Sequence, residues 1–157
     1  VDRRLYGRDA PPGTGPWGAQ VVFIDRNIVI DLVEKTARWS SWSREAVGKA
    51  IADGPLLANA IVMAECAPRF ESVEEELSYF DLIGIKMKEI PATAAFRAGR
   101  AHRDYRRAGG ERSSMVADFL IGAHASALGA RLLTRDRQRF VSYFPELTLI
   151  TPETENG

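Results

Sequence analysis

The chain has a single cysteine, no long hydrophobic run and no excess of either charge, and each of these absences excludes a class of protein. One cysteine among 157 residues can form neither an intramolecular disulfide nor a thiolate metal cluster. No segment approaches the ~18 apolar residues that indicate a membrane span. Basic and acidic residues each number 21, so no net charge attracts the whole chain to nucleic acid or to a membrane. We therefore expect a cytoplasmic protein with no membrane partner.

The composition predicts one folded domain flanked by irregular ends. A hydrophobic content of 45% over this length is enough to bury a core. Residues 1–20 are rich in proline and glycine and have no periodicity, so we predict a flexible leader or linker there. We assign the folded domain to residues 21–152 and expect the polar residues 153–157 to form a loose tail.

Within residues 21–152, strand-like runs alternate with segments of helical periodicity. Short apolar runs predict strands at residues 21–25, 56–59, 85–90, 131–134 and 147–150. Helices are predicted at about 27–38, 43–52, 60–70, 72–82, 91–108 and 115–128, with N-caps at Ser43, at Ser72 and at Ser113 or Ser114. This alternation predicts an α/β fold built on a central, mainly parallel sheet of four to five strands.

Four acidic residues occupy apolar surroundings. Asp25 ends the first predicted strand and Asp136 follows the strand at 131–134, whereas Glu65 and Asp118 lie in helices with apolar flanks. A carboxylate beside a buried surface is unfavourable unless it is paired or binds a metal. Functional groups of parallel α/β folds gather at the carboxyl ends of strands. We therefore expect the four acids to converge on one electronegative pocket.

Such a pocket suits hard divalent cations, which prefer oxygen ligands. Two ions held a few ångströms apart can clamp the attacking water and the leaving oxygen of a phosphodiester. A structural alternative stays open for each acid by itself. Asp25 or Asp136 can cap the helix that follows it, and Glu65 or Asp118 can face solvent. The presence of all four in one chain favours the metal site.

Four segments of the sequence carry a resemblance to a known family: VVFIDRNIVIDLV, ANAIVMAECA, RSSMVADFLIGAHASALGARLLTRDRQRF and YFPELTLITP. They are similar to the PIN-domain family, and within it to the VapC-type toxins of bacterial toxin–antitoxin pairs. The resemblance extends from residue 21 to about 152. It implies a three-layer α/β/α sandwich and an endoribonuclease that cleaves RNA with a water activated by one or two Mg²⁺ or Mn²⁺ ions.

The resemblance also implies roles for individual residues and partners. The family's acidic quartet, which is both catalytic and metal-binding, falls on Asp25, Glu65, Asp118 and Asp136. Its small polar positions fall on Asn27 and Thr134, which implies supporting roles. It further implies a homodimer and a small antitoxin protein that blocks the metal pocket. One position departs from the pattern, because Arg26 stands where the family usually has a Ser or Thr after the first acid.

Arginine is concentrated in the second half of the chain, with ten between residues 97 and 139. Because phosphate contacts position a nucleic acid, Arg135 and Arg137 beside Asp136 are candidate RNA contacts, and so is Arg26. The arginines of residues 97–107 can equally form a solvated helix face. Several other side chains fit structural roles better than catalytic ones. We expect His124 to pack or to face solvent and Cys66 to fill the core, whereas Asp31 stays open between a metal role and a supporting one.

Two other functions stay open from the sequence alone. A phosphatase of the haloacid-dehalogenase type would use Asp25 as a covalent nucleophile, but it requires a second aspartate where this chain has Asn27. A degenerate PIN-like module, made inactive by Arg26, would only bind a protein partner. Metal binding separates the second possibility from an endoribonuclease.

Overall fold

The computed structural model describes residues 21–35, 38–111 and 115–152, so the predicted leader, tail and caps at Ser113 or Ser114 lie outside the described residues. The described strands form one parallel sheet in the order β3-β2-β1-β4-β5. They are β1 (Val22–Ile24), β2 (Leu56–Ala58), β3 (Ile85–Met87), β4 (Arg131–Leu133) and β5 (Leu149–Ile150). The predicted parallel α/β sheet is confirmed, with strands shorter than the apolar runs indicated.

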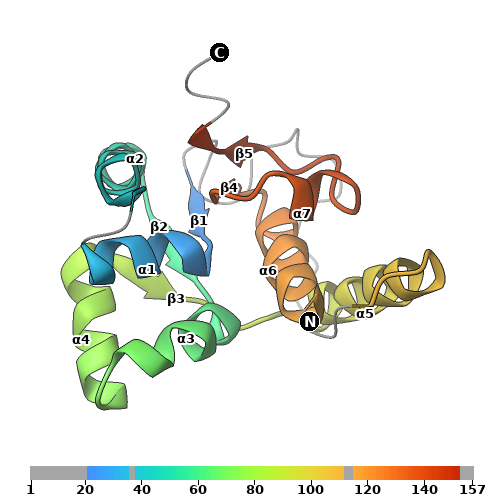
Figure 1. The fold of residues 1–157 in the computed structure, drawn as a ribbon, viewed down its shortest axis with the longest axis horizontal. Helices are drawn as coiled ribbons and strands as arrows, with labels where there is room; N and C mark the ends of the chain where they lie inside the picture. The colour runs from blue at the N-terminus through green and yellow to red at the C-terminus, as the bar shows by residue number, and fades with distance from the viewer. Residues whose placement is uncertain (1–20, 36–37, 112–114, 153–157) are drawn as a thin grey trace.

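Helices cover both faces of this sheet. The described helices are α1 (Arg26–Glu34), α2 (Ser40–Asp53), α3 (Ala60–Cys66), the short 3₁₀ turn η2 (Ala67–Arg69), α4 (Val73–Ile83), α5 (Ala92–Arg107), α6 (Met115–Ala127) and α7 (Gln138–Val141). Figure 1 shows α1 to α4 on one side and α5 to α7 on the other. Right-handed crossovers explain this division, because the chain crosses the sheet in one direction from β1 to β3 and in the other direction from β3 through β4 to β5. The predicted three-layer sandwich is confirmed.

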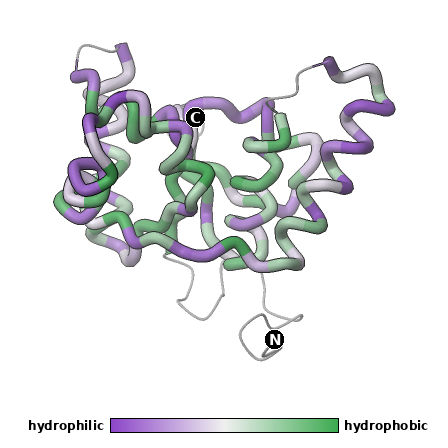
Figure 2. Tube along the Cα trace, turned by 90° about the horizontal axis from the view of Figure 1, so that it is seen from below, coloured by the Kyte–Doolittle hydropathy of each residue, from purple (hydrophilic) through white to green (hydrophobic). Residues whose placement is uncertain are grey.

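The central strands are buried on both faces. Val22, Phe23 and Ile24 of β1 are fully enclosed, and so are Leu132 and Leu133 of β4. A parallel sheet covered by helices requires such continuous apolar strands. Figure 2 shows the hydrophobic residues gathered toward the centre and hydrophilic residues along the outer helices. No helix in the described part of the chain combines the length and apolarity that a bilayer crossing requires.

The direction of the connections reverses between the neighbouring strands β1 and β4. The chain leaves β1 toward the α1 face and leaves β4 toward the α7 face, so the two exits diverge. Asp25 follows β1 directly, and its backbone N–H donates to the Leu133 carbonyl of β4 at 2.9 Å. Such a switch point opens a crevice at the carboxyl ends of the strands. The residues after β1 and β4 therefore meet at one place.

Several local predictions were wrong. Helix α2 begins at Ser40, so Ser43 lies inside it, where its backbone N–H donates to the Trp39 carbonyl, and does not cap it. Helix α1 ends four residues early, and Lys35 follows with a left-handed φ of 52°. Pro91 occupies the N-cap position of α5 and not its first turn. Helix α7 was not predicted, because four residues are too few to show a helical period.

Gly122 explains why α6 carries a glycine in the middle of an apolar helix. A Cβ at this position would lie 2.7 Å from two ring atoms of Phe144, which is closer than carbon atoms approach. Phe144 is buried, and its ring also lies against Phe119 with 6.1 Å between centroids. The absent side chain lets the segment after α7 pack directly on the helix that carries Asp118.

Candidate active site

The four predicted acids come from four separate segments and meet at the crevice between β1 and β4. Asp25 ends β1, Glu65 lies near the end of α3, Asp118 lies in the first turn of α6 and Asp136 follows β4. Asp25 and Asp118 are almost completely buried, at 0% and 2% exposure. A pocket of about 370 Å³ is lined by Asp118 and Asp136 among others, and Asp25 and Glu65 connect to it through arginine side chains.

Asp25 bonds helix α1 with one carboxylate oxygen and the acidic cluster with the other. Its Oδ1 accepts from the Arg26 backbone N–H at 2.7 Å, so Asp25 caps α1 as the structural alternative proposed. Its Oδ2 accepts from the Thr134 hydroxyl at 2.7 Å and from Arg139 Nη2 at 3.3 Å. Capping and a place in the acidic cluster are therefore compatible in one carboxylate.

Asn27 and Thr134 join the start of α1 to the end of β4. The Asn27 amide donates to Thr134 Oγ1 at 3.3 Å, and its carbonyl accepts from the Arg135 backbone N–H at 3.3 Å. Thr134 Oγ1 also accepts from the Asp136 backbone N–H at 3.1 Å. These bonds fix the segment that carries Asp136 relative to Asp25, which is the arrangement a supporting role requires.

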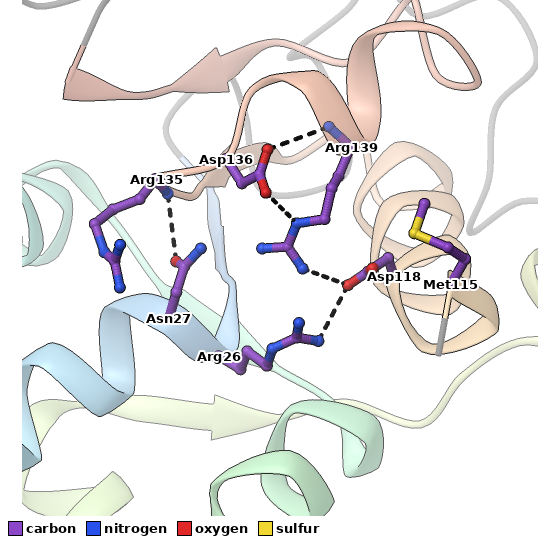
Figure 3. Close-up of a pocket in the computed structure, with 7 residues that line it drawn as sticks. All are labelled: Arg26, Asn27, Met115, Asp118, Arg135, Asp136 and Arg139. Carbon is purple, nitrogen blue, oxygen red and sulfur yellow. Dashed lines mark hydrogen bonds and ion pairs between the residues drawn. The ribbon is translucent and has the colours of Figure 1, made fainter. Parts of the chain in front are cut away.

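Arg139 is the residue of the site that sequence reasoning missed. Its Nη1 donates to Asp118 Oδ1 at 2.6 Å, its Nε to Asp136 Oδ2 at 2.7 Å, and its Nη2 to Asp25 at 3.3 Å. Figure 3 shows its guanidinium between Asp136 and Asp118. The only signal in the sequence was the spacing of three residues from Asp136, which puts both on one face of a helical turn.

Arg26 points into the acidic cluster. Its Nη1 donates to Glu65 Oε2 and, at 3.1 Å, to Asp118 Oδ1. In Figure 3 it reaches Asp118 from the side opposite Arg139. The one departure from the family pattern therefore places a positive charge between two of the predicted metal ligands.

The other two candidate RNA contacts lie in different surroundings. Arg137 is exposed at the start of α7. Arg135 also lines the pocket, but its guanidinium is held by Asp31, with Nε and Nη2 donating at 2.7 and 3.1 Å. Asp31 is 1% exposed and accepts a third bond from the Ser43 hydroxyl at 2.6 Å. Asp31 therefore belongs to a separate ion pair.

Burial and neighbouring charge set the acidity of the cluster. Burial raises the pKa of Glu65, which Arg26 partly offsets and Asp118 reinforces. Burial likewise raises the pKa of Asp118 against the opposing effect of Arg139 and Arg26. Burial alone would lower the pKa of Arg139, but three surrounding carboxylates raise it overall. The four carboxylates of the cluster also outnumber the two arginines that they bond.

The donor set has the oxygen chemistry of a Mg²⁺ or Mn²⁺ site, and one of its atoms lacks a partner. Glu65 Oε1 is buried without a hydrogen bond among the described residues. No three acidic, His or Cys side chains of the described ranges lie close enough together to share an ion as they stand. The Arg139 guanidinium lies between Asp118 and Asp136 (Figure 3), and the Arg26 guanidinium bonds both Glu65 and Asp118. A metal fits this set of donors if a cation that now lies between them makes room.

His124 and Cys66 lie in the core, as expected from the sequence. The His124 ring packs on Phe23 at 5.2 Å, and burial lowers its pKa to about 4. Its Nδ1 accepts from the Asn59 amide at 3.1 Å, because the Asn59 oxygen already caps α3 through two backbone N–H groups. Burial raises the pKa of the Cys66 thiol to about 12, which excludes a thiolate nucleophile at neutral pH.

Comparison with known proteins agrees with this geometry. The family model described as PIN domain matches residues 22–143. No curated protein matches the chain in sequence. A chain of VapBC2 from Rickettsia felis, solved bound to a fragment of promoter DNA, superposes with a TM-score of 0.63 at 19% identity, covering 83% of this chain and 98% of that one.

Two further solved structures share the fold. VapBC-1 from nontypeable Haemophilus influenzae gives a TM-score of 0.62 at 17% identity, over 83% of this chain and 97% of that one. A toxin–antitoxin complex from Klebsiella pneumoniae gives 0.59 at 21% identity, also over 83% and 97%. At these identities the likeness establishes the architecture of the chain.

Proposed function

Because the chain belongs to the PIN-domain family, we propose that it is a metal-dependent endoribonuclease that cleaves RNA phosphodiester bonds with a metal-activated water. The observation that carries the proposal is the acidic cluster at the switch point of the sheet. Four carboxylates that are distant in sequence meet there beside a pocket. Buried carboxylates in excess of their counterions are unfavourable unless a further cation joins them.

Asp25, Glu65, Asp118 and Asp136 would hold one or two Mg²⁺ or Mn²⁺ ions. When bound, such an ion lowers the pKa of a coordinated water and neutralises charge on the phosphate. Thr134 donates to Asp25 and so fixes which oxygen of this carboxylate faces Arg139. Asn27 holds Thr134 and the following backbone in place. Both residues act by orienting the acids.

Arginines beside the pocket would position the RNA. Arg137 is exposed next to Asp136, and Arg135 lines the pocket, so both can reach a phosphate that approaches Asp118 and Asp136. Arg26 can do so once its side chain leaves the acids. These contacts would bind the backbone of the strand and would not discriminate between bases.

We further propose that the chain is the cytoplasmic toxin of a toxin–antitoxin pair, that it forms a homodimer, and that a small antitoxin protein blocks the pocket. The fold shared with chains of VapBC and other toxin–antitoxin complexes supports this assignment. An antitoxin segment carrying a basic side chain would suit the uncompensated carboxylates of the pocket.

The proposal is tested by incubating the purified chain with end-labelled RNA in Mn²⁺ or Mg²⁺, with and without chelator. Cleavage that requires the metal and is lost in Asp25→Asn supports it. Asp104→Asn is the matched control, because Asp104 is an exposed acid of α5 whose contact is its neighbour Arg103. Metal-independent cleavage, or full activity of Asp25→Asn, would contradict it.

One observation favours a second candidate, the degenerate module that only binds a partner. Both Arg26 and Arg139 occupy the space between the carboxylates, as a permanently inactive pocket would require. Binding of an antitoxin without any metal binding at neutral pH would favour this candidate. No observation favours the phosphatase, because the amide that replaces its second aspartate is bonded to Thr134 and Arg135.

A further inference from the structure

The two arginines of the acidic cluster are held in different ways. Arg139 uses three nitrogens on three carboxylates, and its side chain is 15% exposed. Arg26 uses one nitrogen, Nη1, for both Glu65 and Asp118, and its side chain is 27% exposed. Arg139 is therefore held on three sides, whereas Arg26 has fewer bonds to break and is more exposed to solvent.

The balance of charge points in the same direction. When ionised, the four carboxylates exceed the two guanidiniums by two negative charges, and they exceed Arg139 alone by three. A guanidinium cannot coordinate a metal, and its positive charge between two ligands repels an incoming cation. The oxygens that Arg26 holds are Glu65 Oε2 and Asp118 Oδ1, and Glu65 Oε1 beside them has no hydrogen bond within the described ranges.

We propose that Arg26 is an internal counterion of the pocket that a divalent metal ion displaces: the ion takes the place of its guanidinium between Glu65 and Asp118, and Arg26 turns toward the pocket mouth. This inference rests on the proposed metal site and adds a regulatory residue to it. Metal affinity is lowered because each binding event must first separate Arg26 from two carboxylates. Arg139 stays in place, and the divalent ion offsets two of the three negative charges that are in excess once Arg26 has left.

This displacement of Arg26 by a metal ion, called the exchange below, has a second consequence, which concerns the metal-free protein. With Arg26 in place, Glu65 and Asp118 have a positive neighbour even without metal, so the metal-free fold is stabilised. A chain with a small hydroxyl at position 26 lacks that neighbour and depends more strongly on the ion. Arg26 therefore makes the fold less dependent on metal and the binding of metal weaker.

Calorimetric titration with Mn²⁺ tests this on the full chain and on Arg26→Thr, Arg26→Lys and Arg100→Thr. Arg26→Thr should bind Mn²⁺ more tightly by on the order of tenfold, because one competing charge is gone. Arg26→Lys keeps the charge and should stay near the parent affinity. Arg100→Thr removes an arginine that lies over Phe96 on α5, and it should leave the affinity unchanged.

Thermal melting of the same proteins gives a readout that does not depend on catalysis. The rise in Tm caused by Mn²⁺ should be larger for Arg26→Thr than for the parent, and its metal-free Tm should be lower. Tighter binding by Arg26→Thr supports the exchange even if the parent binds no Mn²⁺ at all. Equal affinity in parent and Arg26→Thr overturns the exchange while the metal site stands. If neither protein binds Mn²⁺, both the exchange and the proposed metal site fail.

Discussion

Two charged clusters lie at the same end of the sheet and share two segments of the chain, but they differ in how their charges balance. Helix α1 contributes Asp31 to one cluster and Arg26 to the other. The segment after β4 contributes Arg135 to the first and Asp136 to the second. In the first cluster one carboxylate meets one guanidinium and a serine hydroxyl. In the second, four carboxylates share two guanidiniums.

This difference in charge balance distinguishes the first cluster, a structural ion pair, from the second, a candidate cation site. The carboxylate of Asp31 is buried, bidentate to Arg135 and bonded to Ser43, so nothing further is needed there. The acidic cluster keeps an excess of negative charge, and burial raises the pKa of both Glu65 and Asp118. A cluster that folding leaves short of positive charge is ready to bind a cation.

Neutralising one acid of the second cluster should abolish function and spare the fold. In Asp118→Asn we expect RNA cleavage to fall by at least about a hundredfold, since a proposed ligand of the metal is lost. The free energy of unfolding should hold or increase, because the substitution removes a buried negative charge from a cluster that has too many. Cleavage assays and urea denaturation on the same preparation measure both effects. Retained cleavage, or a large loss of stability, would remove the distinction between the clusters.

Neutralising the acid of the first cluster, Asp31, should instead destabilise the fold and leave metal binding unchanged. Asp31→Asn leaves the Arg135 guanidinium without its counterion, so we expect a loss of about 3 kcal/mol in the free energy of unfolding. Metal affinity should change little, because Asp31 contacts none of the four acids in the bonds that define the site. Asp104→Asn serves as the surface control for denaturation. A stable Asp31→Asn with weakened Mn²⁺ binding would instead make Asp31 part of the metal site.

The sequence predicts the components of the acidic cluster better than its charge balance. Asp25 and Asp136 could be found because a parallel α/β fold brings strand ends together. The N-cap of α4 was equally readable, since Ser72 accepts from the Glu75 backbone N–H at 3.1 Å within one turn. Each of these features depends on a few consecutive residues or on the fold class alone.

The features that could not be predicted depend on contacts between distant segments. Ser43 has the sequence signature of a cap, but it lies inside α2, where it meets Asp31 across the helix pair. Arg135 stands 104 residues from Asp31. In the sequence, Arg139 is one of ten arginines between residues 97 and 139. In the structure, α7 places it between three carboxylates. Which acid is paired and which is left in excess follows only from the packed structure.

The position of Asp118 within the second cluster depends on how closely α6 packs against the segment after α7. A substitution of Gly122, one helical turn from Asp118, tests this packing. Gly122→Ala places a methyl group 2.7 Å from the Phe144 ring, and overpacking of this kind costs about 2 kcal/mol. Gly99→Ala is the matched control, since a Cβ in α5 meets nothing within 4 Å and should raise stability by about 0.5–1 kcal/mol. Denaturation curves of both variants measure these changes in stability. Unchanged stability of Gly122→Ala would show that the Phe144 ring has room to move.

The last effect concerns pH and separates the acidic cluster from the core beside it. The pKa of His124 is lowered from 6.5 to about 4 in the folded chain, so the unfolded chain binds the extra proton first as the pH falls. Stability from His124 is therefore complete above about pH 6.5 and is lost toward pH 4, at about 1 kcal/mol per pH unit. The raised pKa values of Glu65 and Asp118 act with the opposite sign, because the folded chain protonates these acids more readily than the unfolded one.

The substitution His124→Gln removes the first of these two contributions and leaves the second. The glutamine oxygen can still accept from the Asn59 amide, so the cap of α3 is preserved. We expect the parent to lose stability in urea between pH 6.5 and pH 4, and the variant to lose less or to gain. Parallel pH dependences in the two proteins would contradict a contribution of His124 to stability in this range.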